Sequence, residues 1–428
     1  MKTINIIFDA SVIIKSFNET SFNRAGIFWC AFNILKQFNN SELYKVTLLV
    51  SPEIIYKKKG GLKDFIFSFP VIIYFDKILF KKKLNFWINQ LNRKNFLFFI
   101  LANLFKYCIQ LGLIFIPKTK NKLFNDFDIY FSPVHGIPDI IKENPKIKSF
   151  HILHDAIASL SGISTASPLK SNFRYINLIE NLNKETFYFC VSECTKNDFL
   201  KLFQDRLDEK KMFVTPNAAA QSFYPNYDKH ELQRVLKKYG ITQKQGDCYI
   251  FSFCSVDPRK NIVFTCKCFI NFLKKHSINN MYFYIGGAHF PEYSSIFEKE
   301  ISEFTYLKNR IVRLGYVDDQ DVNILYSNSL LFTYISQYEG FGMPPLEAMQ
   351  AGAPVICSNN SSLPEVVGDA AITIDYNSEE QCVKAFEDLY FNDDLRKIYI
   401  KKGLERAKLF SWEKTFNIMS NIIQEKIK

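Results

Sequence analysis

Residues 338–352 read Tyr-Glu-Gly-Phe-Gly-Met-Pro-Pro-Leu-Glu-Ala-Met-Gln-Ala-Gly, and they stand between two apolar runs at 330–335 and 354–357. Short apolar runs bounded by turn residues predict strands. The two prolines suit the first turn of a helix, and Gly352 suits its end. The stretch therefore predicts a strand, a glycine-containing loop, a short helix and a second strand, an order typical of an α/β sheet.

Two carboxylates in this stretch have positions that favour ligand binding. We expect Glu347 in the first helical turn, where backbone N–H groups lack partners and the positive end of the helix dipole lies. Glu339 lies in the loop beside Gly340 and Gly342, which have no side chains to keep a ligand from the backbone. Ligands of open α/β sheets gather at the carboxyl ends of the strands. The pattern predicts a binding site, and two unrelated surface charges are the alternative.

The same segment resembles the Glu-x7-Glu motif of the family-four (group 1) retaining glycosyltransferases, which have the GT-B fold. Gly-Phe-Gly, the proline before Leu-Glu-Ala, the following Ala-Gly-x-Pro-Val and the Leu-Pro-Glu-Val-Val-Gly-Asp-Ala-Ala at 363–371 all match the family pattern. The resemblance implies that Glu347 accepts hydrogen bonds from the ribose of a nucleotide sugar and that Glu339 accepts them from its sugar. Further donor contacts are implied for Gly340, Phe341, Gly342, Met343 and Leu346.

A second motif, Asp-Pro-Arg-Lys-Asn at 257–261, follows an expected strand and is expected to open a helix that ends near residue 275. Two cations in a first helical turn oppose the helix dipole, and a bound anion would remove that conflict. The segment resembles the family's Glu-Pro-Arg-Lys-Asn phosphate clamp, with Asp257 in place of glutamate. The resemblance implies that Arg259 and Lys260 hold the donor diphosphate and stabilise it as a leaving group; solvated basic side chains are the alternative.

The first half of the chain offers further candidates. His154 and Asp155 come at the end of an expected strand, and the resemblance implies that His154 faces the donor sugar. His151 is the alternative, but it would point to the opposite face of the strand. Gly26 opens an expected helix, where family members commonly place glycine so that the backbone meets the diphosphate. This chain has one glycine there rather than a pair, and Ala218 replaces the glycine of the family's Pro-Asn-Gly.

The alternation of strands and helices predicts an α/β protein with two doubly wound, Rossmann-like domains that face each other across a cleft. We expect an N-terminal acceptor-binding domain at 1–225, a nucleotide-sugar-binding domain at 226–410, and a terminal helix at 411–428 that the resemblance implies crosses back to the first domain. Residues 10–23 read as a loop, and 226–246 as a polar passage between the domains. Strands are expected at 3–9, 45–51, 127–132, 147–154, 187–192, 212–215, 249–254, 281–285 and 310–314.

The composition is that of a globular protein. The 428 residues are 47% apolar and 23% charged, which is enough for two domains with full cores and excludes a disordered chain. The ten cysteines are scattered without Cys-x-x-Cys pairs, as in a cytosolic protein with reduced thiols. The N-terminus runs directly into a strand, so no secretory signal is expected and the expected location is cytoplasmic.

Positive charge is concentrated in an insertion at 57–122. This window holds fourteen Lys and Arg residues and two Asp residues, a balance of +12 against +11 for the whole chain. The cations alternate with aromatic residues, which favours attachment to an anionic membrane surface over a solvated helix face or a nucleic-acid site. An apolar run at 96–116 approaches the length of a membrane span, but Lys106 near its middle favours a buried or interfacial helix in a peripheral protein.

No metal site or cofactor is predicted. Residues 126–128 (Asp-Phe-Asp) precede their strand, whereas ligands gather past strand ends. Residues 318–321 (Asp-Asp-Gln-Asp) read as the start of a helix. Arg259 and Lys260 are expected to provide the phosphate neutralisation that a metal provides elsewhere.

The resemblance implies a retaining transferase that moves a hexose from a nucleotide sugar to a glycan acceptor that is lipid-linked, in surface-polysaccharide or lipopolysaccharide synthesis. The motif style resembles bacterial mannosyltransferases of surface polysaccharides, so GDP-mannose is the first candidate donor. Within enzymes, a GT-B sugar-nucleotide epimerase or a phosphorylase is the alternative, although no second phosphate clamp is visible. A non-catalytic GT-B subunit of a glycosylation complex is the third reading, against which the intact Glu339, Glu347, Arg259 and Lys260 argue.

Overall fold

The computed structural model describes residues 3–18, 26–50, 68–73, 124–160, 173–287, 291–302 and 308–428. Most of the basic window at 57–122 and the whole apolar run at 96–116 lie outside these residues, so the predictions made for them stay predictions. None of the helices in the described part of the chain combines the length and the apolar character needed to cross a lipid bilayer.

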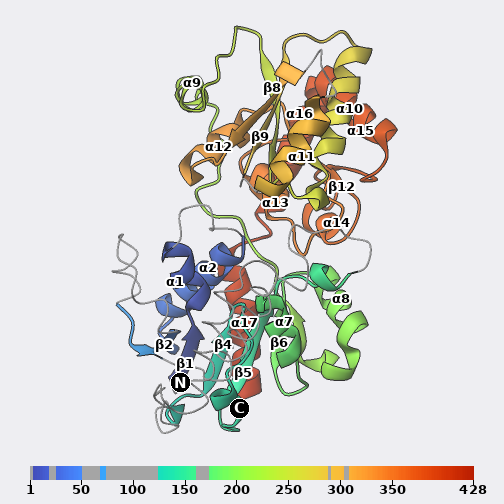
Figure 1. Ribbon diagram of the computed structural model, residues 1–428. Helices are drawn as coiled ribbons and strands as arrows, with labels where there is room; N and C mark the ends of the chain where they lie inside the picture. Colours follow the sequence, from blue (N-terminus) through green and yellow to red (C-terminus); the bar gives the residue numbers. More distant parts are fainter. Residues whose placement is uncertain are drawn as a thin grey trace, which may run out of the picture.

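The first half of the chain forms a parallel sheet. Within the described residues it has seven strands in the order β3-β2-β1-β4-β5-β6-β7 (Figure 1). Its central strands are buried on both faces, which explains their continuous apolar sequences, and Phe131, Phe150 and Phe189 lie side by side across them. The strands are β1 (Ile4–Asp9), β2 (Tyr44–Val50), β3 (Val71–Ile73), β4 (Ile129–Ser132), β5 (Lys148–Leu153), β6 (Phe187–Cys190) and β7 (Met212–Val214).

In the described residues of this half the helices are α1 (Ser11–Asn18), α2 (Gly26–Asn40), α6 (Asp139–Lys142), α7 (Phe173–Asn181) and α8 (Glu193–Phe203). Helix α1 lies where a loop was expected at 10–23, so that expectation was wrong. Asp9, the last residue of β1, accepts a hydrogen bond from the N–H of Ser11 at 2.9 Å and satisfies one of the free amides at the helix start. Val12 and Ile13 are buried, so packing outweighs the low helix propensity of this β-branched segment.

The second half forms another parallel sheet, with six strands in the described residues in the order β10-β9-β8-β11-β12-β13. The strands are β8 (Cys248–Phe253), β9 (Met281–Gly286), β10 (Ile311–Gly315), β11 (Leu331–Tyr334), β12 (Val355–Ser358) and β13 (Ile372–Ile374). The helices are α9 (Lys229–Lys238), α10 (Ile262–Lys275), α11 (Pro291–Ser302), α12 (Asp319–Ser327), α13 (Met343–Gln350), α14 (Leu363–Val367), α15 (Glu379–Phe391) and α16 (Asp393–Ala407).

Helix α9 occupies the segment that the sequence presented as a polar passage. Asp228 caps it by accepting hydrogen bonds from two backbone amides, and Leu232, Val235 and Leu236 bury one face. Most residues of α9 are polar and its apolar stripe is narrow, so the helical pattern is weak in the sequence and the segment resembles a loop.

The last helix, α17 (Trp412–Ile427), returns to the first sheet, as expected for GT-B. It lies against the N-terminal half in Figure 1, and the ring of Phe416 packs edge-on against that of Phe38 in α2 at 5.1 Å between centroids. The hydroxyl groups of Tyr44 and Ser420 are 2.7 Å apart. The two doubly wound sheets and this crossing helix confirm the predicted fold class.

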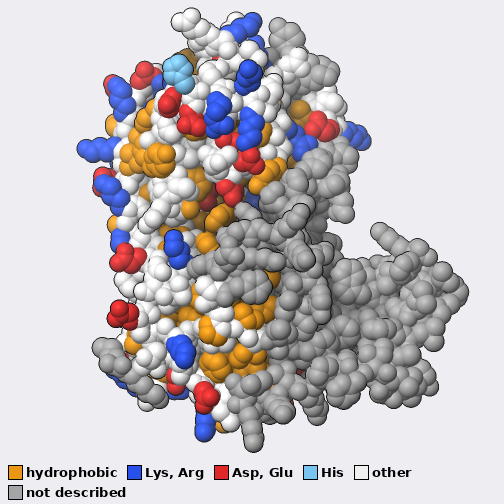
Figure 2. All heavy atoms as spheres, turned by 90° about the vertical axis from the view of Figure 1, so that its left-hand side faces the viewer, with side chains coloured by type: hydrophobic (Ala, Val, Ile, Leu, Met, Phe, Trp, Pro, Cys, Tyr) orange, Lys and Arg blue, Asp and Glu red, His pale blue; other side chains and the backbone are white. Residues whose placement is uncertain are grey.

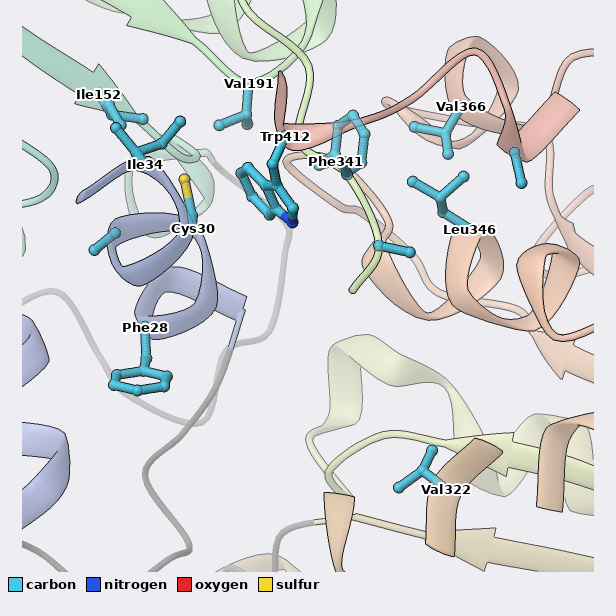
Figure 3. Close-up of a cluster of buried hydrophobic side chains, with 14 of the residues drawn as sticks. Phe28, Cys30, Ile34, Ile152, Val191, Val322, Phe341, Leu346, Val366 and Trp412 are labelled. Carbon is cyan, nitrogen blue, oxygen red and sulfur yellow. The ribbon is translucent and has the colours of Figure 1, made fainter. Parts of the chain in front are cut away.

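Apolar contact between the two halves is continuous. Figure 3 shows Trp412 at the start of α17 between Val191 of the first half and Phe341 of the second, and all three are buried. Phe341 also packs edge-on against Phe410 at 6.0 Å. The loop that follows β11 is therefore anchored by its aromatic side chain where the two halves meet.

The described surface is mixed in charge. On the face shown in Figure 2, Lys and Arg side chains stand among Asp and Glu side chains over the described residues. This agrees with the sequence, in which everything outside 57–122 is nearly neutral.

Candidate active site

The loop between β11 and α13 reaches its helix through Gly342. This residue has φ +108° and precedes the first helical residue, Met343, and a Cβ there would lie 2.6 Å from a methyl group of Leu363. The prolines fall in the first turn as predicted, and Gly352, with φ +81°, follows the helix end. Glu347 is the fifth helical residue, so it lies in the second turn and not in the first, because the helix begins ahead of the prolines.

Glu339 is held by four hydrogen-bond donors. Its Oε1 accepts from Lys260 Nζ at 2.6 Å and from Arg259 Nη1 at 2.8 Å. It also accepts from the hydroxyl groups of Ser336 at 2.6 Å and Tyr334 at 3.1 Å. Burial acts to raise the pKa of Glu339, but the two cations outweigh it and lower the pKa to about 2. Among the described residues all four bonds reach Oε1, which leaves Oε2 for a ligand.

The two cations stand in a turn of their own. Pro258–Lys260 forms one 3-10 turn after β8, and Asn261, in the left-handed conformation with φ 55°, separates it from α10. The sequence had predicted Arg259 and Lys260 in the first turn of α10. That prediction was wrong, because both residues lie in the separate turn that precedes α10. Asp257 caps the turn by accepting from the N–H of Arg259 at 2.9 Å. Burial lowers the pKa of Lys260, whose Nζ lies 5.0 Å from the centroid of the Tyr334 ring.

Glu347 has a different environment. Its Oε2 accepts a hydrogen bond from the hydroxyl group of Tyr326 at 3.1 Å. Burial raises the pKa of Glu347 to about 7, and this one hydrogen bond offsets only part of that effect. Near neutral pH the carboxyl group is therefore divided between its protonated and ionised forms.

The first domain brings His154 and Asp155 to the same place. A Cβ on Gly340 would lie 2.1 Å from the carbonyl oxygen of His154 and 2.7 Å from Cβ of Asp155, so only glycine fits. His154 Nε2 lies 2.8 Å from the carbonyl oxygen of Pro133, and burial lowers the pKa of His154. His151 is buried inside β5, where burial lowers its pKa to about 3.

Of the remaining residues predicted to contact the donor, Gly26 lies at the boundary between the domains, and Phe341 and Leu346 lie in the hydrophobic core. Gly26 begins α2, and a Cβ there would be 3.7 Å from Cγ of Met343, so the first residues of α2 and α13 are neighbours across the two domains. Phe341 and Leu346 have buried side chains in the hydrophobic core. A ligand could meet these two residues only through their backbone.

The acidic segments that were weighed as metal sites have structural roles. Asp128 accepts from the N–H of Asn5 at 2.8 Å ahead of β4, and Asp321 accepts from Arg234 at 3.1 Å. Asp318 precedes α12 as its N-cap residue, as predicted. Within the described ranges, no group of three or more His, Cys, Asp and Glu side chains could hold a metal ion.

Sequence reasoning missed the hydroxyl groups of Tyr326, Tyr334 and Ser336, which hold the two glutamates. Tyr334 and Ser336 stand five and three residues before Glu339, so a polar residue at a buried strand end was a usable signal. Tyr326 is on α12, and nothing in the local sequence connects it with Glu347.

Comparisons with known proteins bear on the family and the fold of this chain. Residues 237–406 match the family "Glycosyl transferases group 1". The chain is 32% identical over 281 residues to the O-antigen chain mannosyltransferase B of Escherichia coli, covering 64% of this chain and 71% of that protein. It is 23% identical over 278 residues to the serotype-specific mannosyltransferase WbdA of E. coli, covering 64% of this chain but spanning only 33% of WbdA.

Solved structures of similar fold include the sucrose-phosphate synthase of Thermosynechococcus elongatus, with a TM-score of 0.68 and 13% identity over 99% of this chain and 98% of that one. Anabaena HepE in complex with UDP and glucose has a TM-score of 0.66 at 13% identity, over 99% of this chain and 100% of that one. These likenesses show the GT-B fold. The family match and the 32% identity to the O-antigen chain mannosyltransferase B establish that the chain belongs to the group 1 glycosyltransferases.

Proposed function

We propose that this chain is a retaining glycosyltransferase that moves a hexose from a nucleotide sugar to a hydroxyl group of a glycan acceptor. The observation that carries the proposal is the convergence of Arg259 and Lys260 on Glu339 at the carboxyl end of the second sheet. Two fixed cations beside an ionised carboxylate suit a ligand that offers phosphate oxygens and sugar hydroxyls together.

The nucleotide would lie along α13, with its ribose on Glu347. A ribose has two neighbouring hydroxyl groups, and a carboxylate can accept a hydrogen bond from each. Tyr326 contacts one oxygen of Glu347 and orients the group. The diphosphate would then reach Arg259 and Lys260, and the sugar would reach the free oxygen of Glu339.

In the proposed transfer, the bond between the anomeric carbon and the phosphate oxygen breaks, and its electron pair leaves with the diphosphate. Arg259 and Lys260 stabilise that developing charge, which is commonly a large catalytic contribution. The acceptor oxygen bonds to the anomeric carbon on the same face, and its proton passes to the departing phosphate oxygen. Oδ1 of Asp155 accepts from the N–H of Ile157 and Oε1 of Glu339 accepts from the two cations, and the proposed transfer gives neither carboxylate the role of nucleophile.

Mannose from GDP-mannose is the first candidate donor, because the similar E. coli proteins are named as mannosyltransferases, one of them for O-antigen chains. The name of the first relative also supports a surface-polysaccharide glycan as the acceptor, and we propose that this glycan is lipid-linked. The mechanism proposed here uses no metal ion, since the two cations take the role of charge neutralisation.

The test is incubation with a panel of radiolabelled nucleotide sugars that includes GDP-mannose and UDP-glucose, with glycan acceptors. Transfer with retained anomeric configuration, read by NMR of the product, is expected. Inversion at the anomeric carbon would contradict the same-face mechanism. Epimerised donor, or turnover that depends on free phosphate, would favour the alternative enzymes, and binding without any turnover would favour the non-catalytic subunit.

Attachment to the inner face of the cytoplasmic membrane is the part of the proposal that rests on the window 57–122. The protein should sediment with vesicles that contain anionic lipid, less with neutral vesicles, and salt should release it as the Debye length falls from about 10 Å at 0.1 M to about 3 Å at 1 M. Equal binding to both kinds of vesicle would contradict it. The lysines to neutralise are Lys57, Lys58, Lys59, Lys81, Lys82 and Lys83.

A further inference from the structure

Helix α8 of the first domain receives a cap from the second domain. The carboxylate of Glu365, in α14, accepts hydrogen bonds from the N–H groups of Glu193 at 2.9 Å and Cys194 at 3.0 Å. These are the first two residues of α8, whose amides have no partner inside the helix and lie at the positive end of its dipole. A carboxylate is the strongest side-chain acceptor for such amides, so this contact joins the two domains by charge-assisted hydrogen bonds.

The same end of α8 holds the loop that carries Glu339. The carbonyl oxygen of Gly340 accepts from Ser192 Oγ at 2.6 Å and from Thr195 Oγ1 at 3.0 Å. Thr195 Oγ1 also lies 3.2 Å from the carbonyl oxygen of His154. Thr195 thus contacts both sides of the site at the point where Gly340 passes the His154 backbone.

A third contact lies one turn farther along α8. The hydroxyl group of Tyr338 donates to the carboxylate of Asp198, 2.9 Å from its nearer oxygen. The residues on both sides of Glu339 are therefore fixed to a helix of the other domain.

Within the second domain the loop has its own supports, which do not involve Glu365. Ser361 Oγ accepts from the N–H of Glu339 at 3.0 Å, and Ser362 Oγ lies 2.9 Å from the carbonyl oxygen of Glu339. Among the described residues, the side-chain hydrogen bonds of Glu365 all go to the first domain, whereas its backbone carbonyl accepts from Arg406. Its carboxylate is therefore placed to set the relation between the domains rather than the shape of the loop.

We propose that Glu365 is a positioning residue that, by capping α8 across the domain boundary, holds the Glu339 loop in register with His154 and Asp155 during transfer. The proposal rests on the proposed function, in which the donor lies on the second domain and the acceptor on the first. The proposal makes different predictions for the affinity for the nucleotide and for the rate of transfer. Nucleotide binding is assigned mainly to the second domain, whereas turnover also requires the first domain to be in place.

The experiment compares Glu365→Ala and Glu365→Gln with Asp369→Asn as the matched control. Asp369 is an exposed carboxylate just after α14 that pairs with Lys402 at 2.8 Å inside the second domain. Calorimetry with a nucleoside diphosphate gives Kd, and steady-state transfer gives kcat. Glu365→Ala should lower kcat by about tenfold or more, because both charge-assisted hydrogen bonds to α8 are lost, and leave Kd within about twofold. Glu365→Gln keeps one acceptor oxygen and should be intermediate, and Asp369→Asn should equal the wild type.

An unchanged kcat in Glu365→Ala would overturn the proposal. A loss of nucleotide affinity as large as the loss of kcat would also overturn the proposal, because Glu365 would then be needed for the structure of the second domain itself. Thr195→Val tests the contact from the other side and should lower kcat without changing Kd. Solution scattering with saturating nucleoside diphosphate tests this proposal separately from the proposed function, because the measurement needs no turnover. The Glu365→Ala variant should have a larger radius of gyration than the wild type. Equal radii of gyration would count against the cap.

Discussion

The loop after β11 and the second turn of α13 each hold one glutamate, eight residues apart in sequence, and they give it opposite properties. Glu339 has two cations and two hydroxyl groups on one oxygen, and its pKa falls to about 2. Glu347 has one tyrosine hydroxyl group, and burial raises its pKa to about 7. Both carboxyl groups are largely removed from solvent, so the difference comes from their partners.

The different environments of Glu339 and Glu347 suit different parts of a nucleotide sugar. The loop has fixed charges of both signs, as expected where a charged diphosphate meets a sugar. Among the described residues no cation pairs with the carboxyl group at the helix position, which suits an uncharged partner such as a ribose. Substitutions that change one side of this contrast at a time test it.

The largest effect is expected on the loop side, from Arg259→Ala. Loss of one preorganised donor to a developing charge typically costs about 100- to 1,000-fold in rate, so kcat should fall by that much while the protein stays folded. Arg206→Ala, at an exposed position of the first domain, is the matched control and should keep wild-type kinetics. A purified, folded Arg259→Ala enzyme of near-normal kcat would remove this residue from the site.

On the helix side, Glu347→Ala should lower kcat/KM for the donor by about 100-fold, since two hydrogen bonds to a charged acceptor are lost. Because Glu347 is assigned to the nucleotide and not to the reacting centre, most of the loss should be in KM. Steady-state kinetics at several donor concentrations checks this. A loss confined to kcat would place Glu347 beside the sugar instead.

The pH dependence should follow Glu347 and not Glu339. The ionised form of Glu347 accepts both ribose hydroxyl groups, and it is depleted as the pH falls through about 7. Donor affinity should therefore weaken by up to about tenfold for each pH unit below that point and level off above it. Glu347→Gln should give a flatter profile. A wild-type profile that is already flat from pH 6 to 8 would mean that the group is ionised throughout.

The smallest effect is expected from metal removal. Arg259 and Lys260 are proposed to neutralise the diphosphate, so treatment with EDTA should change the transfer rate by less than about twofold. The measurement is the initial rate with EDTA and after adding back magnesium or manganese. Abolished activity that either metal restores would contradict the proposed division of charge.

Elements with strong local patterns were predictable from the sequence. The strands around 338–352 and the crossing helix α17 follow from apolar runs, proline and glycine positions and the family resemblance. The three-residue edge strands β3 and β13 were missed, whereas the equally short β7 was predicted at 212–215, so a run of this length is not a dependable pattern. Helix α1 was missed because its β-branched residues form a helix only when Val12 and Ile13 are buried by the rest of the fold.

The site was predictable in its charged residues and not in its contacts. Arg259, Lys260, Glu339 and Glu347 follow from two short motifs, although the left-handed Asn261 moved the cations out of the helix that was expected to hold them. Glu365 was visible in the sequence only as part of a matching segment. Its partners in α8 lie more than 170 residues earlier in the chain, and no local pattern connects the two.

The most direct test of the account is a crystal structure with a bound nucleoside diphosphate. We expect phosphate oxygens within hydrogen-bonding distance of Arg259 and Lys260, and the ribose hydroxyl groups on the carboxylate of Glu347. The second sheet also has a cavity of about 400 Å³ at the opposite, amino ends of β8 and β11, lined in part by Lys244, Cys248, Leu330 and Arg396. A nucleotide bound in that cavity, with Arg259 and Glu347 untouched, would contradict the account.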